Sequence, residues 1–338
     1  MIGTILFSVK KPSREMTGTI LFSFLFLICS IGRSEETSCE SEVCYPDYGD
    51  ILIGRQSQLF ASSTCGVKGV ERFCESELCT ECDSDPLFRD DQYKYHAIEN
   101  VIKSNTSDRS GFWWQSENGV EEVTIQLDLE SEMIITNVMM IFRSRKPSRM
   151  VIERSRNFAR SWYPYQYYSS DCPRSFPHIR EGDRVNLTDV TCLAMKETPG
   201  GLIFRVLPYG FSDAAASSGE IFNLLAATNL RIRFLEFGAL NGTEESKESL
   251  FYSLSKLYIR GSCSCFGHGN QCIPNEDEQV IEGKVYSRCN CVHNTEGPNC
   301  EMCKPSHNNV MWKPADINHH NPCQSMLDLS SGIISFTP

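Results

Sequence analysis

The last eight cysteines of the chain constrain its fold more than any other feature. They follow one another at short intervals between Cys263 and Cys323, and too few apolar residues separate them to build an ordinary core. Covalent cross-links must therefore hold this stretch together, as in the small disulfide-rich modules of secreted proteins.

Whether these thiols are oxidised depends on the compartment, and the amino terminus bears on that question. The stretch from Thr19 to Ile28 is apolar but too short to cross a bilayer as a helix, and small residues follow it at Ser30 and Gly32. This pattern is typical of a secretory signal peptide, which we expect at residues 1–32. Loss of Cys29 with that peptide leaves an even number of the 17 cysteines in an extracellular chain.

The remaining cysteines fall into two groups, which predicts two domains. One group lies between Cys39 and Cys192, and the other is the cluster of eight near the carboxyl end. We expect a larger domain at residues 39–262 and a disulfide-rich module at residues 263–323. A tail without cysteine follows at residues 324–338.

Two CxxC pairs, Cys79/Cys82 and Cys300/Cys303, raise structural zinc as an alternative. An oxidising compartment and the C-x-C pairs interleaved among these cysteines favour disulfides instead. The histidines of the tail form no HExxH motif and no paired helical spacing. We therefore expect disulfides here and no zinc site.

The charge of the chain restricts its partners. A net charge of −11 argues against nucleic acid or an anionic membrane surface as the main partner. Calcium and basic protein surfaces suit this charge better. No stretch after Gly32 is long and apolar enough to form a membrane-spanning helix.

The region 39–262 shows the periodicity of β-strands. Apolar and polar residues alternate in Val123–Leu129 and again in Leu230–Phe234, the pattern of strands with one buried face. Ile134–Phe142 is more continuously apolar, and Pro and Gly separate these runs from their neighbours. The sequence therefore predicts an all-β domain, a sandwich or jelly roll. Further strands are expected at Leu202–Leu207 and Leu254–Ile259.

Two adjacent tryptophans stand beside a polar turn. In an extended backbone, the side chains of Trp113 and Trp114 point in opposite directions, so we expect one in the core and the other partly exposed. Two interpretations of this segment remain open. It is aromatic packing next to a turn, or it is an interaction edge that uses the polar side chains of Gln115, Glu117 and Asn118.

Three N-glycosylation sequons begin at Asn105, Asn186 and Asn241. Because a glycan must project into solvent, we expect these three segments to be surface loops.

Several segments, in order along the chain, resemble the N-terminal domain of a laminin short arm. They are WWQSENGVEEVTIQLDLESE, MVIERSRNFARSWYPYQYYSSDC, GGLIFRVL, NLLAATNLRIRF and LYIRGSCSCFGHGNQC. The IERS segment and the spacing into RGSC resemble laminin β chains more than α or γ chains. The tail, with CVHNTEGPNCEMC, is similar to a laminin-type EGF-like repeat, so the resemblance covers about Cys39 to Cys323.

The resemblance implies a disulfide pattern that cysteine counting cannot supply, since eight cysteines allow many pairings. In the family's EGF-like repeat the first cysteine pairs with the third, the second with the fourth, the fifth with the sixth and the seventh with the eighth. The implied pairs are Cys263–Cys272, Cys265–Cys289, Cys291–Cys300 and Cys303–Cys323. In the larger domain we expect only Cys172–Cys192, and the pairing of Cys39, Cys44, Cys65, Cys74, Cys79 and Cys82 stays open.

The resemblance also implies a function. The N-terminal domains of laminin α, β and γ arms bind one another in a ternary node, and many such weak contacts build the polymer of basement membranes. The implied protein is a secreted glycoprotein of the extracellular matrix whose jelly-roll sandwich forms the tip of a β-like short arm. Its partners are the α and γ short arms, and it supports cell adhesion and tissue organisation.

Two further expectations rest on the resemblance. Ser63, in the polar segment Ser62–Thr64 before Cys65, is expected on a surface strand as part of the interaction face. Calcium supports polymerisation in this family, and some members hold the ion in a loop close to the WWQSEN segment. In this chain, Asp108 and Ser110 offer oxygen ligands there.

The chain also departs from the family. After Cys323 no further EGF-like repeat and no coiled coil follow, so we interpret the tail as the end of an incomplete sequence or of a short secreted form. The alternative function is a stand-alone netrin-like ligand, with cell-surface receptors as partners, or a module that caps laminin networks. An enzyme is not expected, because the chain has no GxSxG, HExxH or Gly-rich phosphate loop.

Overall fold

The computed structural model describes residues 39, 42–75, 78–103, 111–207, 219–238, 246–316 and 318–325. These residues belong to the compact unit Cys39–Pro338. The expected signal peptide, the sequons at Asn105 and Asn241, and the calcium candidates Asp108 and Ser110 lie outside the described residues.

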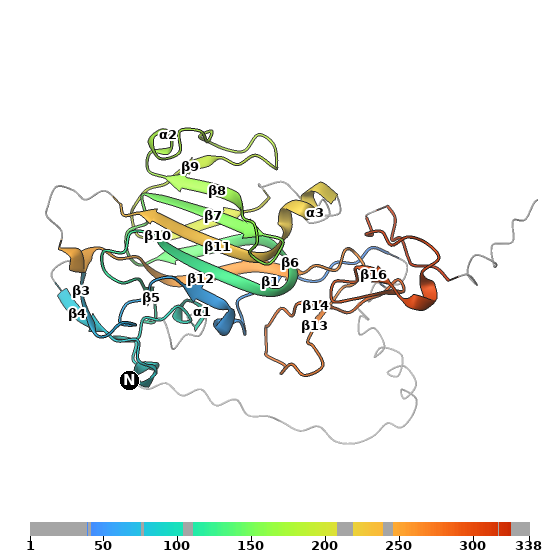
Figure 1. The fold of residues 1–338 in the computed structure, drawn as a ribbon, viewed down its shortest axis with the longest axis horizontal. Coiled ribbons are helices and arrows are strands. Elements are labelled where there is room, and N and C mark those ends of the chain that lie inside the picture. The colour runs from blue at the N-terminus through green and yellow to red at the C-terminus, as the bar shows by residue number, and fades with distance from the viewer. Residues whose placement is uncertain are drawn as a thin grey trace, which may run out of the picture. The chain divides into compact units, whose positions relative to one another are not determined.

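Strands dominate the described residues (Figure 1). In the larger domain they are β1 (Gly49–Asp50), β2 (Leu59–Ala61), β3 (Glu71–Glu75), β4 (Leu78–Cys82), β5 (Trp114–Gln115), β6 (Val123–Phe142), β7 (Arg149–Ser155), β8 (Tyr163–Ser169), β9 (Cys192–Ala194), β10 (Gly200–Arg205), β11 (Ala226–Glu236) and β12 (Ser253–Cys263). In the module they are β13 (Cys272–Ile273), β14 (Arg288–Cys289), β15 (Thr295–Glu296) and β16 (Met302–Cys303). The helices are short: α1 (Asn100–Lys103), α2 (Cys172–Ser175) and α3 (Gly219–Leu225), with single 3-10 turns η1 (Gln56–Gln58), η2 (Pro86–Phe88), η4 (Lys247–Ser249) and η5 (Pro305–His307).

One long strand, β6, belongs to both layers of the sandwich. Its residues 123–128 pair with β11 on one side, and residues 125–127 pair with β2 on the other. Its residues 137–142 pair with β10 and with β12. Strands β7, β8 and β9 extend the first layer beyond β11, and β1 and β5 lie beside β12 in the second. The predicted all-β sandwich is confirmed.

The burial pattern of β6 shows how one strand serves two layers. Every second residue from Val123 to Leu129 is buried, and every second residue from Val138 to Phe142 is buried, but the two series are out of phase. Between them, the four consecutive residues 133–136 are all buried. Because side chains alternate along a strand, this change of phase lets both parts of β6 face the same core.

The sequence predicted two separate strands in this region, and on that point the prediction was wrong. The segment between them, residues 130–132, contains neither Pro nor Gly, and the strand continues through it. The core fills the space between the two layers. It includes Ile125, Leu127, Ile232 and Phe234 from the first layer and Val138, Met140, Phe204, Leu257 and Ile259 from the second.

Disulfides hold the module and fasten the loops of the sandwich. The module contains Cys263–Cys272, Cys265–Cys289, Cys291–Cys300 and Cys303–Cys323, which are the pairs that the family resemblance implies. The larger domain contains Cys172–Cys192 together with three pairs that the sequence left open: Cys39–Cys44, Cys65–Cys82 and Cys74–Cys79.

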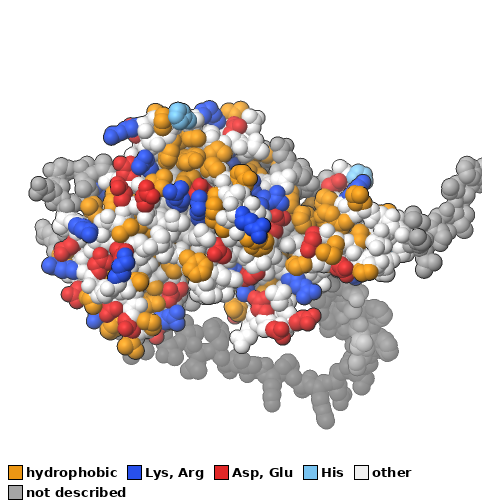
Figure 2. Space-filling model, viewed as in Figure 1, with side chains coloured by type: hydrophobic (Ala, Val, Ile, Leu, Met, Phe, Trp, Pro, Cys, Tyr) orange, Lys and Arg blue, Asp and Glu red, His pale blue; other side chains and the backbone are white. Residues whose placement is uncertain are grey.

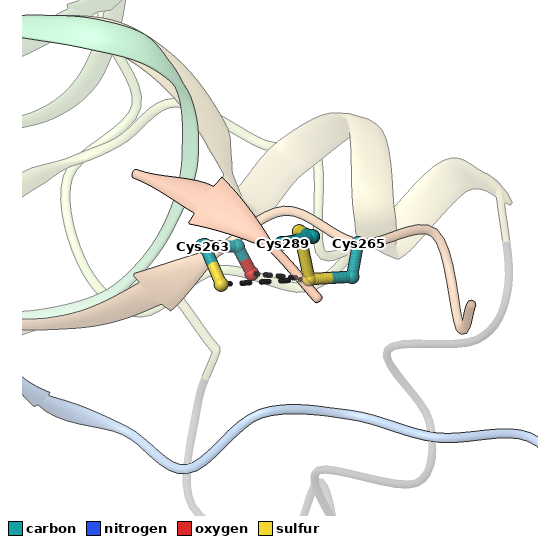
Figure 3. A group of neighbouring side chains, drawn as sticks. All are labelled: Cys263, Cys265 and Cys289. Carbon is teal, nitrogen blue, oxygen red and sulfur yellow. Dashed lines mark hydrogen bonds between the residues drawn. A yellow bond between two sulfur atoms is a disulfide. The ribbon is translucent and has the colours of Figure 1, made fainter. Parts of the chain in front are cut away.

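The densest sulfur cluster lies where β12 enters the module (Figure 3). The Sγ atoms of Cys263 and Cys265 are 3.4 Å apart, and Cys265 is bonded to Cys289. A thiolate is needed to bind zinc, and the cysteines of both CxxC motifs are in disulfides as well. The pairing thus matches the disulfide interpretation of the CxxC motifs.

Candidate functional site

The candidate interaction residues, although distant in sequence, come together at the edge where β5 joins β12. The backbone N–H of Cys65 donates to the carbonyl oxygen of Gln115 at 2.9 Å. The backbone N–H of Glu117 donates to Ser63 Oγ at 3.0 Å, and that hydroxyl also lies 3.4 Å from the Glu117 carboxylate. The segment before the Cys65–Cys82 disulfide and the segment after the two tryptophans therefore form one structural unit.

Most of these residues are buried, which corrects the expectation of an exposed polar edge. Ser63 is 5% exposed, Gln115 0% and Asn118 7%. Ser63 lies in a loop after β2 rather than on a surface strand. The physical reason is that most polar groups of this set find a partner inside the protein, although the side-chain oxygen of Asn118 has none among the described residues.

Asn118 illustrates that internal pairing. Its backbone N–H donates to the Glu71 carboxylate at 2.9 Å, and its side-chain amide donates to the carbonyl oxygen of Arg72 at 2.7 Å. Glu117 is the most exposed member of the set, and its carboxylate pairs with Lys68 at 2.9 Å. Lys68 is itself 81% exposed, so this ion pair contributes little to stability.

Both tryptophans are buried, so the expectation that one of them is partly exposed was wrong. Trp114 belongs to β5 and packs in the main core, and its indole N–H donates to Thr64 Oγ1 at 3.1 Å. Trp113 points the other way, as the alternation requires, but a second small hydrophobic cluster covers it. That cluster consists of Cys65, Phe73, Cys82, Trp113 and Phe251.

Charged and titratable groups complete the cover over Trp113. The ring of His96 stacks on the indole with the centroids 4.0 Å apart, and the guanidinium of Arg143 lies 4.0 Å from the ring centroid. Arg143 also makes a bidentate ion pair with Glu75 at 2.8 and 2.9 Å. Burial, and then the nearby Arg143 charge, lower the pKa of His96 to about 4, so the imidazole is neutral at physiological pH.

The exposed part of this region carries large apolar side chains among charged ones. Residues 65–94 carry the β3–β4 hairpin and the two disulfides Cys65–Cys82 and Cys74–Cys79. Figure 2 shows hydrophobic side chains among charges of both signs at the end of the molecule that holds β3 and β4. We call the large exposed hydrophobic residues of this segment the rim: Val67 (64% exposed), Val70 (62%), Leu78 (76%), Leu87 (88%) and Tyr93 (68%).

Sequence reasoning missed the rim, although a signal for it was present. The segment is rich in charges and cysteines, so an isolated aliphatic residue in it has few apolar neighbours in the sequence to pack against. Exposed hydrophobic patches with a polar surround mark interaction sites on soluble proteins. The arrangement can therefore present exposed apolar side chains on a disulfide-stapled segment, which the hydrogen bonds of Asn118 to Glu71 and Arg72 join to the turn after the tryptophans.

Of the remaining predicted sites, Asn186 lies among the described residues. It is exposed in the loop between α2 and β9, where its backbone N–H donates to the Asp189 carboxylate at 2.8 Å. Its glycosylation stays a prediction. Among the described residues, no helix has the length and apolar character required to cross a membrane.

Comparison with known proteins gives a consistent result. Residues 44–261 match the family model of the laminin N-terminal domain (domain VI). The chain is 38% identical to laminin subunit beta-1 of Homo sapiens over 327 residues, and 39% identical to laminin subunit beta-1 of Drosophila melanogaster over 311 residues. These alignments cover 90% and 85% of this chain, but 18% and 17% of the respective relatives.

Other matches are weaker. Netrin-4 of Pongo abelii is 30% identical over 297 residues, which is 82% of this chain and 46% of that protein. Among solved structures, the chitosan-binding module 1 of a Paenibacillus chitosanase/glucanase aligns at a TM-score of 0.30 and 12% identity, covering 60% of this chain and 92% of that module. Nothing further rests on that likeness.

The family match covers most of the described sandwich, and the laminin β relatives align through the cysteine-rich module as well. Laminins are secreted proteins of the basement membrane and not enzymes, which places this chain in the extracellular matrix. The chain belongs to the laminin N-terminal domain family and, within it, is similar to the N-terminal region of laminin β subunits.

Proposed function

We propose that this chain is the polymer-forming tip of a laminin β-like short arm, which binds the N-terminal domains of α and γ arms and so supports basement membrane assembly, cell adhesion and tissue organisation. The observation that carries the proposal is the rim, an exposed apolar surface on a family domain whose support is cross-linked and hydrogen-bonded.

The physical properties of the rim suit a weak and repeated contact. Binding costs less entropy when the surface is already ordered, and two disulfides order the segment that carries the rim. The rim offers few side chains, so a single contact is weak, and assembly depends on many nodes acting together. This is the behaviour expected of a network that forms reversibly.

Calcium belongs to the proposal as a cofactor. Calcium takes several oxygen ligands, which Asp108, Ser110 and backbone carbonyls nearby can supply, and these residues lie in the sequence between α1 and the tryptophan segment. We propose that these two residues contribute to a calcium site next to the interaction region. Chelation of calcium should then weaken the binding of this chain to its partner arms.

A polymerisation assay tests the proposal. Excess chain is mixed with intact laminin trimers and calcium, and the polymer is measured by sedimentation. The chain should lower the amount of polymer, because it occupies α and γ arms without extending the network. Leu87→Asp, in the rim, should reduce this inhibition several-fold.

Val280→Asp is the matched control, since Val280 is 82% exposed but belongs to the module. It should inhibit as strongly as the unchanged chain. Unaltered polymerisation in the presence of excess chain would refute the proposed function. Equal inhibition by the Leu87 and Val280 variants would place the contact outside the rim.

The similarity to Netrin-4 favours a second candidate, a ligand of cell-surface receptors that also caps laminin networks. Such a ligand should bind cells that make no laminin. Flow cytometry with the labelled chain on such cells separates the two candidates, because a pure node-forming tip should leave them unstained.

A further inference from the structure

Three histidines meet inside the cysteine-rich module, and the node-forming proposal uses none of them. His268 is 0% exposed and His293 is 7% exposed, and their Nδ1 atoms are 3.0 Å apart. The rings of His293 and His320 have centroids 5.3 Å apart. A buried histidine pair needs a reason, because burial disfavours the charged form.

The hydrogen bonds fix which nitrogen atoms carry protons. His268 Nε2 lies 2.9 Å from the carbonyl oxygen of Lys313, and a carbonyl can only accept, so this nitrogen donates. In the neutral state, His268 Nδ1 then accepts a hydrogen bond from His293 Nδ1. His293 Nε2 is left without a hydrogen-bond partner among the described residues.

The pair lies where three segments of the chain meet. The amino-terminal segment joins the module at Cys44, which forms an isolated β-bridge with His268. The backbone N–H of Cys44 donates to the Gly267 carbonyl oxygen at 3.0 Å. The segment near the carboxyl end joins at Cys323, whose N–H donates to the His293 carbonyl oxygen at 2.9 Å. Backbone contacts at and beside the two histidines thus connect both ends of the described chain to the centre of the module.

The charges around the pair do not compensate for protonation. Burial lowers the pKa of His268. The hydrogen bond to the Lys313 carbonyl raises this pKa in part, but the neighbouring His293 and His320 lower it further. Burial and then His320 lower the pKa of His293, and the backbone carbonyls of Cys39 and Glu42 only partly offset them. Asp316, an acidic residue of this end of the chain, is paired with the exposed His319 at 3.3 Å.

We propose that His268, His293 and His320 form an acid-sensitive latch, which holds the segment around Cys44 on the cysteine-rich module near neutral pH and lets it detach as the pH falls. One proton on the pair preserves the Nδ1–Nδ1 hydrogen bond when it binds at His293 Nε2, the ring nitrogen that has no hydrogen-bond partner among the described residues. A second proton places two N–H donors against each other at 3.0 Å, and the pair must separate.

The direction of the pH effect follows from linkage. A histidine whose pKa is lowered on folding binds protons more weakly in the closed state than in the open one. The contribution of such a histidine to the stability of the closed state is complete above its ordinary pKa of 6.5. This contribution is lost as the pH falls from 6.5 toward the lowered pKa. Each pKa unit of difference changes the opening equilibrium about tenfold.

Hydrogen exchange of the full chain, measured between pH 7.5 and pH 5, tests the latch. After correction for the intrinsic pH dependence of exchange, protection of the Cys44 and Cys323 amides should fall at least about tenfold. Protection of the Ile51 amide, which donates to Ile259 in the sandwich, should stay constant. His293→Gln should abolish the pH-dependent fall, and the control His319→Gln, at an exposed histidine of the same module, should retain it.

A titration of the unchanged chain keeps the test decisive if His293→Gln fails to fold. The side-chain NMR signals of His268 and His293 should titrate below pH 6.5, together with the loss of Cys44 protection. Constant protection of Cys44 down to pH 5, an equal fall at Ile51, or a full pH-dependent fall in His293→Gln would each overturn the latch.

Discussion

The polar residues of the candidate site form hydrogen bonds mainly inside the protein. Ser63, Glu117 and Asn118 are linked through hydrogen bonds to backbone groups, and these bonds join the loop before Cys65 to the turn after the tryptophans. A change at Ser63 should therefore reach a partner protein indirectly, through the position of the loop. The exposed apolar side chains of the rim, by contrast, can touch a partner directly.

Substitution of Ser63 tests this division of roles. Ser63→Ala removes the acceptor of the buried Glu117 N–H, and the free energy of unfolding should fall by about 1 kcal/mol, measured by urea denaturation with the disulfides intact. Ser57→Ala, at an exposed serine of η1, is the control and should change it by less than about 0.5 kcal/mol. A result for Ser63→Ala as small as the control would contradict the proposed link.

The elements show what local sequence could predict and what it could not. The alternation of apolar and polar residues at Val123–Leu129 and Leu230–Phe234 predicted strands that lie within β6 and β11, because one face of each strand is buried there. Strands β7 and β8 were not predicted, since a bulge between Ile152 and Glu153 shifts their pairing, and the buried positions of β8 do not alternate regularly. Alternation could also not reveal that the cluster around Phe73 would cover Trp113, because that cluster comes from a distant segment.

The pairing of β12 with β6 depends on one residue without a side chain. A Cβ atom on Gly261 would overlap the carbonyl oxygen of Ile134 and lie 3.0 Å from Ile51 Cγ2. Gly261→Ala should lower the free energy of unfolding by about 2–3 kcal/mol, because neither neighbour can move without disturbing the core.

Gly201→Ala in β10 is the matched control, since a Cβ there meets nothing within 4 Å. Thermal unfolding of both variants provides the comparison, and the control should melt close to the unchanged chain. Equal melting temperatures for the two variants would show that β6 and β12 can separate at this point without cost.

At the scale of the whole molecule, the disulfides determine which surfaces stay fixed. Among its described residues the module has a small core made of cysteines, so its four cross-links take the place of a large one. The family resemblance supplied those four pairs, but it left open the pairs that staple the rim. Cysteine spacing could not predict these pairs, because the pairing depends on how the chain folds around the β3–β4 hairpin.

The central claim is that this domain binds the N-terminal domains of laminin α and γ arms. Sedimentation velocity of the chain mixed with both domains, with calcium present, tests it most directly. We expect a ternary complex with one copy of each domain, weakened by Leu87→Asp and by chelation of calcium, and unaffected by Val280→Asp. Three species that sediment independently, at concentrations at which intact laminin trimers polymerise, would contradict the account.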